Sequence, residues 1–142
     1  MKICLKTLVR EGGDKQVVID IHKRLPSYII ADCHFACHIK ASYCDGYYLL
    51  EISSQGILQI ECQRCLQPFP YNFEHKSVLA ACTDEVAAEN LLGEYETIVA
   101  NNHFIDLNDI ITDDIYLTAP EKHINSQDCD DEIQLYFRSQ NG

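Results

Sequence analysis

Residues 31–40 alternate strictly between two kinds of side chain. The apolar set is Cys33, Phe35, Cys37 and Ile39, and the intervening set is His34, Ala36, His38 and Lys40. Side chains two positions apart on a strand point the same way. The segment is therefore predicted to be a strand with one buried face. Both cysteines would then belong to the core and both histidines to the surface, which argues against a shared metal site here.

Similar short runs recur along the chain, separated by turn signals. We expect strands over residues 1–9, 16–21, 47–52, 57–62, 69–81 (broken near Glu74 and His75) and 94–100. Asp45-Gly46 is typical of a hairpin turn, and further turns are expected at residues 11–14 and 53–56. This order predicts an antiparallel meander, and a closed barrel and an open sheet fit it equally well.

The second half contains the best helical pattern, over residues 106–119. Asp106 is the expected N-cap, Pro120 ends the helix, and Leu107, Ile110, Ile111 and Ile115 form the apolar stripe, extended by Leu117. A shorter helix is expected over residues 83–92, ended by Gly93. The predicted fold class is α+β: mainly an antiparallel β meander, barrel-like or open, with one helix of the C-terminal half packed on it.

A chain of 142 residues suits a single domain. We divide it into a β-rich half at 1–82, a helical and acidic segment at 83–120, and an acidic tail at 121–142. Eight cysteines do not predict disulfides, because no export signal opens the chain and no apolar run approaches the roughly 18 residues of a membrane helix. We expect a cytoplasmic protein that lies in no membrane and keeps its thiols reduced.

The strongest chemical signal is the Cys62-x-x-Cys65 pair. Two thiolates at this spacing on a tight turn can both face one ion. If the loop after Pro120 returns to this turn, His123 and Cys129 complete a Cys3His site, for which zinc is the natural metal. A redox pair is the first alternative, although such pairs normally precede a helix. A turn with inert, reduced thiols is the second.

Charge is distributed unevenly. The net charge is −11; residues 1–71 hold eight basic and seven acidic side chains, whereas residues 72–142 hold three basic and fifteen acidic. Phosphate backbones repel carboxylates, so an acidic second half favours a basic protein partner over RNA. The helix supplies the candidate docking residues, which are Asp106, Asp109, Asp113 and Asp114. A solvated helix face that binds nothing is the alternative interpretation.

Direct RNA contact would have to use the first half of the chain. The candidate cations are Lys2, Lys6, Arg10, Lys23, Arg24, Lys40 and Arg64. Binding of that kind would weaken steeply with salt. The chain contains no standard nucleophile, phosphate-binding or metalloprotease motif, so we expect no enzymatic activity.

Two segments resemble the YceD-like family of bacterial proteins. Glu61-Cys62-Gln63-Arg64-Cys65, followed by Pro68-Phe69, is similar to that family's E-C-x-R-C…P-F signature. Asp106-Leu107, Ile111, Asp113-Asp114-Ile115, Leu117 and Pro120 follow its acidic, proline-terminated helix without a gap. His123 and Cys129 fall where family members carry a histidine or cysteine after that proline.

The resemblance implies a non-enzymatic role in ribosome biogenesis, supporting the accumulation of 23S ribosomal RNA. It implies no mechanism. Combined with the charge distribution, it leads to the hypothesis of an acidic docking surface for a basic ribosomal protein or assembly factor, with contact to ribosomal RNA indirect. Direct RNA binding through the first half of the chain is the first alternative function, and a small zinc-binding structural or thiol-redox domain is the second alternative.

Overall fold

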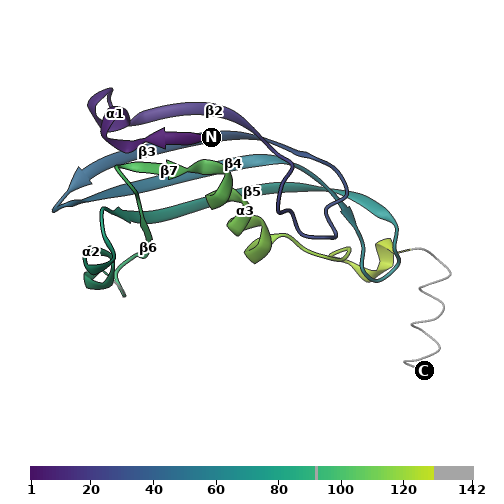
Figure 1. Cartoon of the computed structure of the whole chain (residues 1–142). Helices are drawn as coiled ribbons and strands as arrows, with labels where there is room; N and C mark the ends of the chain where they lie inside the picture. Colours follow the sequence, from purple (N-terminus) through teal and green to yellow (C-terminus); the bar gives the residue numbers. More distant parts are fainter. Residues whose placement is uncertain (92, 130–142) are drawn as a thin grey trace.

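The structure is a computed structural model, and it is described here over residues 1–91 and 93–129. Its main sheet is open and has five strands in the order β2-β3-β4-β5-β6, while β1 and β7 form a separate antiparallel pair (Figure 1). The elements are β1 Lys2–Cys4, α1 Leu5–Arg10, β2 Asp14–Ile21, β3 Cys33–Cys44, β4 Tyr47–Glu61, β5 Pro68–Cys82, α2 Glu85–Asn90, β6 Glu96–Val99, β7 Phe104–Asp106, α3 Leu107–Thr118 and the short 3-10 helix η1 Ser126–Asp128. The α+β class is confirmed, and over residues 1–91 and 93–129 the main sheet is open rather than closed into a barrel.

The strands β2 to β5 pair antiparallel in sequence order, as the meander prediction required. β6 departs from it, because it pairs parallel with β5 after the chain crosses through α2. Asp84 begins α2, and its side chain accepts a hydrogen bond from the backbone N–H of Ala87 at 2.7 Å. At the β3–β4 turn Asp45 and Gly46 both have positive φ, 52° and 85°, which confirms the predicted hairpin.

Two predicted breaks do not exist. Residues 53–56 lie in the middle of β4 rather than in a turn, and β5 continues through Glu74 and His75. Gly56 is needed there for close packing: a Cβ at this position would lie 2.4 Å from the carbonyl oxygen of His34 and 2.7 Å from the Phe35 ring. The glycine therefore marks a close approach within the sheet, and β4 and β5 form one long hairpin.

The N-terminus also differs from the prediction of a single strand over residues 1–9. Only Lys2–Cys4 is a strand, and it pairs with β7; α1 follows at once. Leu5 and Leu8 are both buried, and their spacing is that of one helix face. A strand would have buried Ile3, Leu5 and Thr7 together, leaving Leu8 in water.

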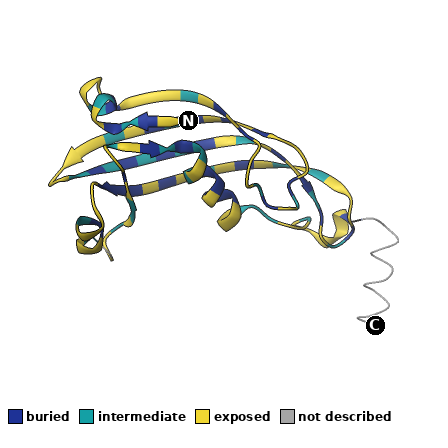
Figure 2. Ribbon diagram, in the orientation of Figure 1, coloured by how far each residue is buried: buried dark blue, intermediate teal, exposed yellow. Residues whose placement is uncertain are grey.

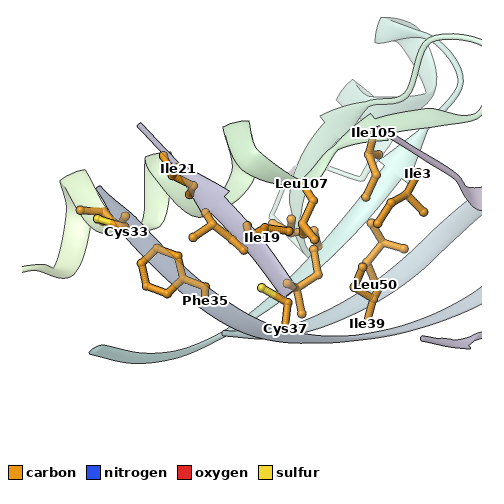
Figure 3. Close-up of a cluster of buried hydrophobic side chains, with 14 of the residues drawn as sticks. Ile3, Ile19, Ile21, Cys33, Phe35, Cys37, Ile39, Leu50, Ile105 and Leu107 are labelled. Carbon is orange, nitrogen blue, oxygen red and sulfur yellow. The ribbon is translucent and has the colours of Figure 1, made fainter. Parts of the chain in front are cut away.

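One face of the sheet carries the core. The predicted alternation of β3 is confirmed, since Cys33, Phe35, Cys37 and Ile39 are all at most 4% exposed, and Figure 2 shows buried and exposed positions alternating along the strands. β1, β7 and α3 cover this face through side chains such as Ile3, Ile105 and Leu107 (Figure 3). Leu117 does not extend the apolar stripe of α3, because it is 76% exposed.

The opposite face of the sheet is largely polar. His34 and His38 lie there, as predicted, and contact Asp20 and Asp14 of the neighbouring strand β2. Burial on the core side raises the pKa of the Cys37 thiol to about 11, which suits an inert core cysteine. The division of these cysteines and histidines between two faces follows directly from the strand period.

Candidate metal centre and acidic helix

The β4–β5 connection is a tight turn that holds both thiols of the Cys-x-x-Cys pair. The backbone N–H of Leu66 donates to the carbonyl oxygen of Cys62 at 2.7 Å, and the N–H of Cys62 donates to Gln67 at 3.0 Å. Leu66 has a positive φ of 63°, which reverses the chain before β5 begins. The turn therefore places Cys62 and Cys65 at the end of the long hairpin.

The segment after α3 returns to this turn. The backbone N–H of Gln63 donates to the carbonyl oxygen of Glu121 at 2.8 Å, and the N–H of His123 donates to the Sγ of Cys62 at 3.3 Å. The helix η1 then brings Cys129 to the same place. The ligand atoms of Cys62, Cys65, His123 and Cys129 all lie within 4.8 Å of one another.

The distances inside this cluster fit a tetrahedral ion. Zn–S bonds of about 2.3 Å and a Zn–N bond of about 2.0 Å give tetrahedral edges of about 3.8 Å between sulfurs and about 3.5 Å from sulfur to nitrogen. The Sγ atoms of Cys62 and Cys129 are 3.9 Å apart, and the Nδ1 of His123 lies 3.5 Å from Cys65 Sγ and 3.6 Å from Cys129 Sγ. The four residues can therefore hold a metal ion with little rearrangement.

The cluster is shielded from solvent. Cys62, Cys65 and Cys129 are 0–5% exposed, and the ring of Phe69 stacks on His123 with centroids 4.3 Å apart. Burial raises the pKa of Cys62, but backbone N–H groups of Cys65, His123 and Arg64 outweigh it and lower that pKa to about 6. Four protein ligands leave no open position for a substrate, which is the pattern of structural rather than catalytic sites.

Burial, followed by hydrogen bonding with Cys65 and Cys62, raises the pKa of Cys129 to about 11. The Cys62–Cys65 turn joins two strands and precedes no helix, in contrast to the usual placement of redox pairs.

The four predicted docking aspartates do not share one face. Asp106 caps α3 by accepting from the N–H of Asn108 at 3.0 Å, as predicted, and exposed Asp109 pairs with Arg24. Asp113 is exposed. The prediction is wrong for Asp114, which is 9% exposed and points towards the sheet. Helix geometry turns adjacent positions by about 100°, so Asp113 and Asp114 face different directions.

Asp114 is held in a small polar contact between α3 and β5 that sequence reasoning missed. Its Oδ2 accepts a hydrogen bond from the Ser77 hydroxyl at 2.8 Å, and its Oδ1 lies 3.6 Å from the Nε2 of His75. Burial, with smaller contributions from Glu96 and Asp113, raises the pKa of the Asp114 carboxyl, against the opposing effects of Ser77 and His75. In the sequence, only the helical period indicates that Asp114 is buried, because it places this residue beside Ile111 and Ile115 on the apolar side of the helix.

Asp114→Asn should remove a pH-dependent loss of stability. The folded protein keeps the Asp114 proton to a higher pH than the unfolded chain does, so stability falls as pH rises from the ordinary pKa of 3.8 through the raised folded value. Asparagine avoids this loss and still offers Ser77 an acceptor oxygen. Between pH 3 and pH 7, urea unfolding should show the free energy of unfolding of the variant increasing relative to that of the wild type as pH rises. A constant difference across that range would contradict this account.

The predicted RNA-contacting cations lie on separate parts of the fold. Arg64 is in the β4–β5 turn, at the opposite end of the sheet from α1, which carries Lys6 and Arg10 (Figure 1). Lys40 belongs to the polar face of β3, and Arg24 is paired with Asp109. Lys2 lies in β1, beside Asp106 in the β1–β7 register, and exposed Lys23 follows β2. The described residues therefore do not bring this set together.

No helix in residues 1–91 and 93–129 is long and apolar enough to span a membrane. No curated protein and no solved structure matches the chain. A family model described as "Large ribosomal RNA subunit accumulation protein YceD" matches residues 50–137, more than half of the chain. The match begins in β4 and includes all four members of the Cys3His cluster as well as α3. The chain therefore belongs to the YceD family.

Proposed function

We propose that this protein is a non-enzymatic ribosome-biogenesis factor that supports the accumulation of 23S ribosomal RNA. The observation that carries the proposal is the family match, which covers the metal cluster and the acidic helix together. The protein acts by binding a basic ribosomal protein or assembly factor, and its contact with ribosomal RNA is indirect. It works in the cytoplasm.

The Cys3His cluster holds zinc in this proposal, and the zinc is structural. Three thiolates and one imidazole are ligands that suit zinc, and the spacings between them match tetrahedral edges. When bound, the ion fixes the segment after α3 against the β4–β5 turn. This holds α3 and its acidic side chains in one position relative to the sheet.

The docking surface consists of the carboxylates of half-buried Asp106, at the start of α3, and of exposed Asp109 and Asp113. Asp114 is not part of it, since its side chain faces Ser77. These carboxylates repel a phosphate backbone and attract lysine and arginine side chains. The scattered positions of the cations in the first half also favour a protein partner over direct RNA contact.

Asp113→Lys tests this function in cells that lack the wild-type protein. The matched control is Glu74→Lys, which reverses another exposed charge, on the polar face of β5. We expect only Asp113→Lys to lower the ratio of 23S to 16S ribosomal RNA. We also expect it to recover basic ribosomal proteins from lysate about tenfold less well, since like charges across an interface cost affinity. Wild-type behaviour of a folded Asp113→Lys protein in both assays would refute the docking surface.

A further inference from the structure

The strand β6 leaves one edge of the main sheet open. It is the last strand in the sheet order and pairs with β5 on one side. The backbone N–H of Ala100, directly after β6, donates to the carbonyl oxygen of Cys82 at 2.7 Å. Hydrogen-bonding residues alternate along a strand, so the backbone groups of Thr97 and Val99 face away from β5. An edge of this kind can pair with another extended chain.

A groove of about 640 Å³ lies along this edge, between β6 and α3. Its apolar side chains include Ile98, Phe104 and Ile110, and Phe104 is 45% exposed although it is a large aromatic residue. Val99, at the edge itself, is 40% exposed. Among residues 1–91 and 93–129, no strand pairs with the outer side of β6, so the groove combines edge backbone groups with exposed apolar side chains.

Charge defines what this groove can accept. Asp106, Asp109 and Asp113 line it, against a single lysine, Lys2. Arg24 pairs with Asp109, and the N-terminal ammonium lies 3.5 Å from the Oδ1 of Asp106. Within residues 1–91 and 93–129 Asp113 has no ion-pair partner, so its carboxylate carries the charge complementarity. The stems of lysine and arginine can cover apolar surface while their charged ends reach carboxylates. The groove is thus complementary to a basic chain and opposed to a nucleic acid.

We propose that this groove binds an extended, basic segment of a partner protein, which adds to the sheet as a further strand beside β6. The segment's backbone pairs with Thr97 and Val99. Its lysine or arginine stems lie on Ile98 and Ile110, and their charges reach Asp109 and Asp113. The inference rests on the proposed function, because it gives the basic partner a binding mode. Strand addition supplies affinity through main-chain hydrogen bonds and selectivity through alternate side chains.

Three labelled peptides test the proposal by fluorescence anisotropy on the full-length protein. The first is a capped peptide of four Arg-Val repeats, the second carries N-methyl groups on alternate amides, and the third has glutamate in place of arginine. We expect the first to bind, N-methylation to weaken it about tenfold or more by removing main-chain donors, and the glutamate peptide not to bind. Amide chemical shifts of Thr97 and Val99 should move on binding.

Variants separate the contributions of backbone and charge. Val99→Pro removes the edge N–H without changing the pairing with β5, and Asp113→Lys reverses the charge. Each should weaken binding of the Arg-Val peptide about tenfold, whereas Glu74→Lys should not.

Equal binding of the methylated and unmethylated peptides, still dependent on Asp113, would overturn strand addition but not the acidic docking surface. Binding unaffected by Asp113→Lys, or absent altogether, would overturn the groove as the site; the assay of 23S ribosomal RNA in cells then judges the proposed function separately. The N-methylated peptide keeps the test decisive if Val99→Pro does not fold.

Discussion

Cys62→Ser should leave the purified protein without zinc, whereas wild-type protein purified without chelator should carry about one zinc per chain by elemental analysis. Serine removes one of four ligands, and the Cys62 thiol is the one whose pKa the surrounding N–H groups lower. A bound ion stabilises the folded state by RT ln(1 + [L]/Kd), which is about 4 kcal/mol when free zinc exceeds Kd a thousandfold. We expect urea unfolding to show a loss of this size.

The loss of stability in Cys62→Ser should be local as well as global. Hydrogen exchange should accelerate in the β4–β5 turn and in residues 121–129, which the cluster joins. Cys44→Ser is the matched control and should retain zinc, because Cys44 is an exposed cysteine at the end of β3, paired with Tyr47 at the start of β4. Wild-type protein without zinc, or a Cys62→Ser protein that keeps a full equivalent, would show that the cluster is a turn with reduced thiols.

Phe35→Ala should destabilise the protein by about 3–5 kcal/mol, the usual cost of emptying a buried phenylalanine site. Phe35 is 1% exposed and meets Phe73 edge to face, with ring centroids 5.5 Å apart. Its ring also fills the space that Gly56 leaves on β4, where backbone approaches backbone. The cavity cannot collapse easily because rigid strands surround it, so we expect a value towards the upper end of the range.

Denaturant unfolding of two further variants would test this packing. Gln55→Ala changes an exposed side chain next to Gly56 and should alter stability by no more than about 0.5 kcal/mol. In a double-mutant cycle Phe35 and Phe73 should show a coupling of about 0.5–1.5 kcal/mol, as aromatic pairs do. A small effect of Phe35→Ala, with no coupling to Phe73, would mean that this part of the core is loosely packed.

Features set by nearby residues could be predicted from the sequence. The period of two in β3, the Asp45-Gly46 turn and the capped, proline-terminated α3 all depend on positions within a few residues of each other, and the structure confirms each one. The cysteine and histidine residues of the metal cluster can be identified for the same reason, because ligand type and spacing are local properties of the sequence. Whether these four residues meet depends on the path of the segment after Pro120, and only the structure shows that this segment returns to the β4–β5 turn.

Features that depend on distant contacts were missed. β1 pairs with β7 about a hundred positions later, and β6 pairs parallel to β5, so no local pattern specifies either one. The break predicted at residues 53–56 had a similar cause: Ser53, Ser54 and Gly56 are typical turn residues, but long-range pairing with β5 on one side and close packing against Phe35 on the other override that preference. Asp113 and Asp114 look equivalent in the sequence, because adjacent acidic residues can be told apart only when the buried side of the helix is known.

The ligands of the metal cluster close a ring in the chain. Cys65 and His123 are 58 positions apart, and β5, β6 and α3 all lie between them. A permanent link across so many residues would lower the conformational entropy of the unfolded chain. By the loop-closure relation used for disulfides, this would stabilise the folded state by about 4 kcal/mol. A bound ion constrains the unfolded chain in this way only while all four ligands coordinate it, so the constraint is reversible. Removing the ion should therefore weaken not just the turn but every element that the ring encloses, including the helix that carries the docking carboxylates.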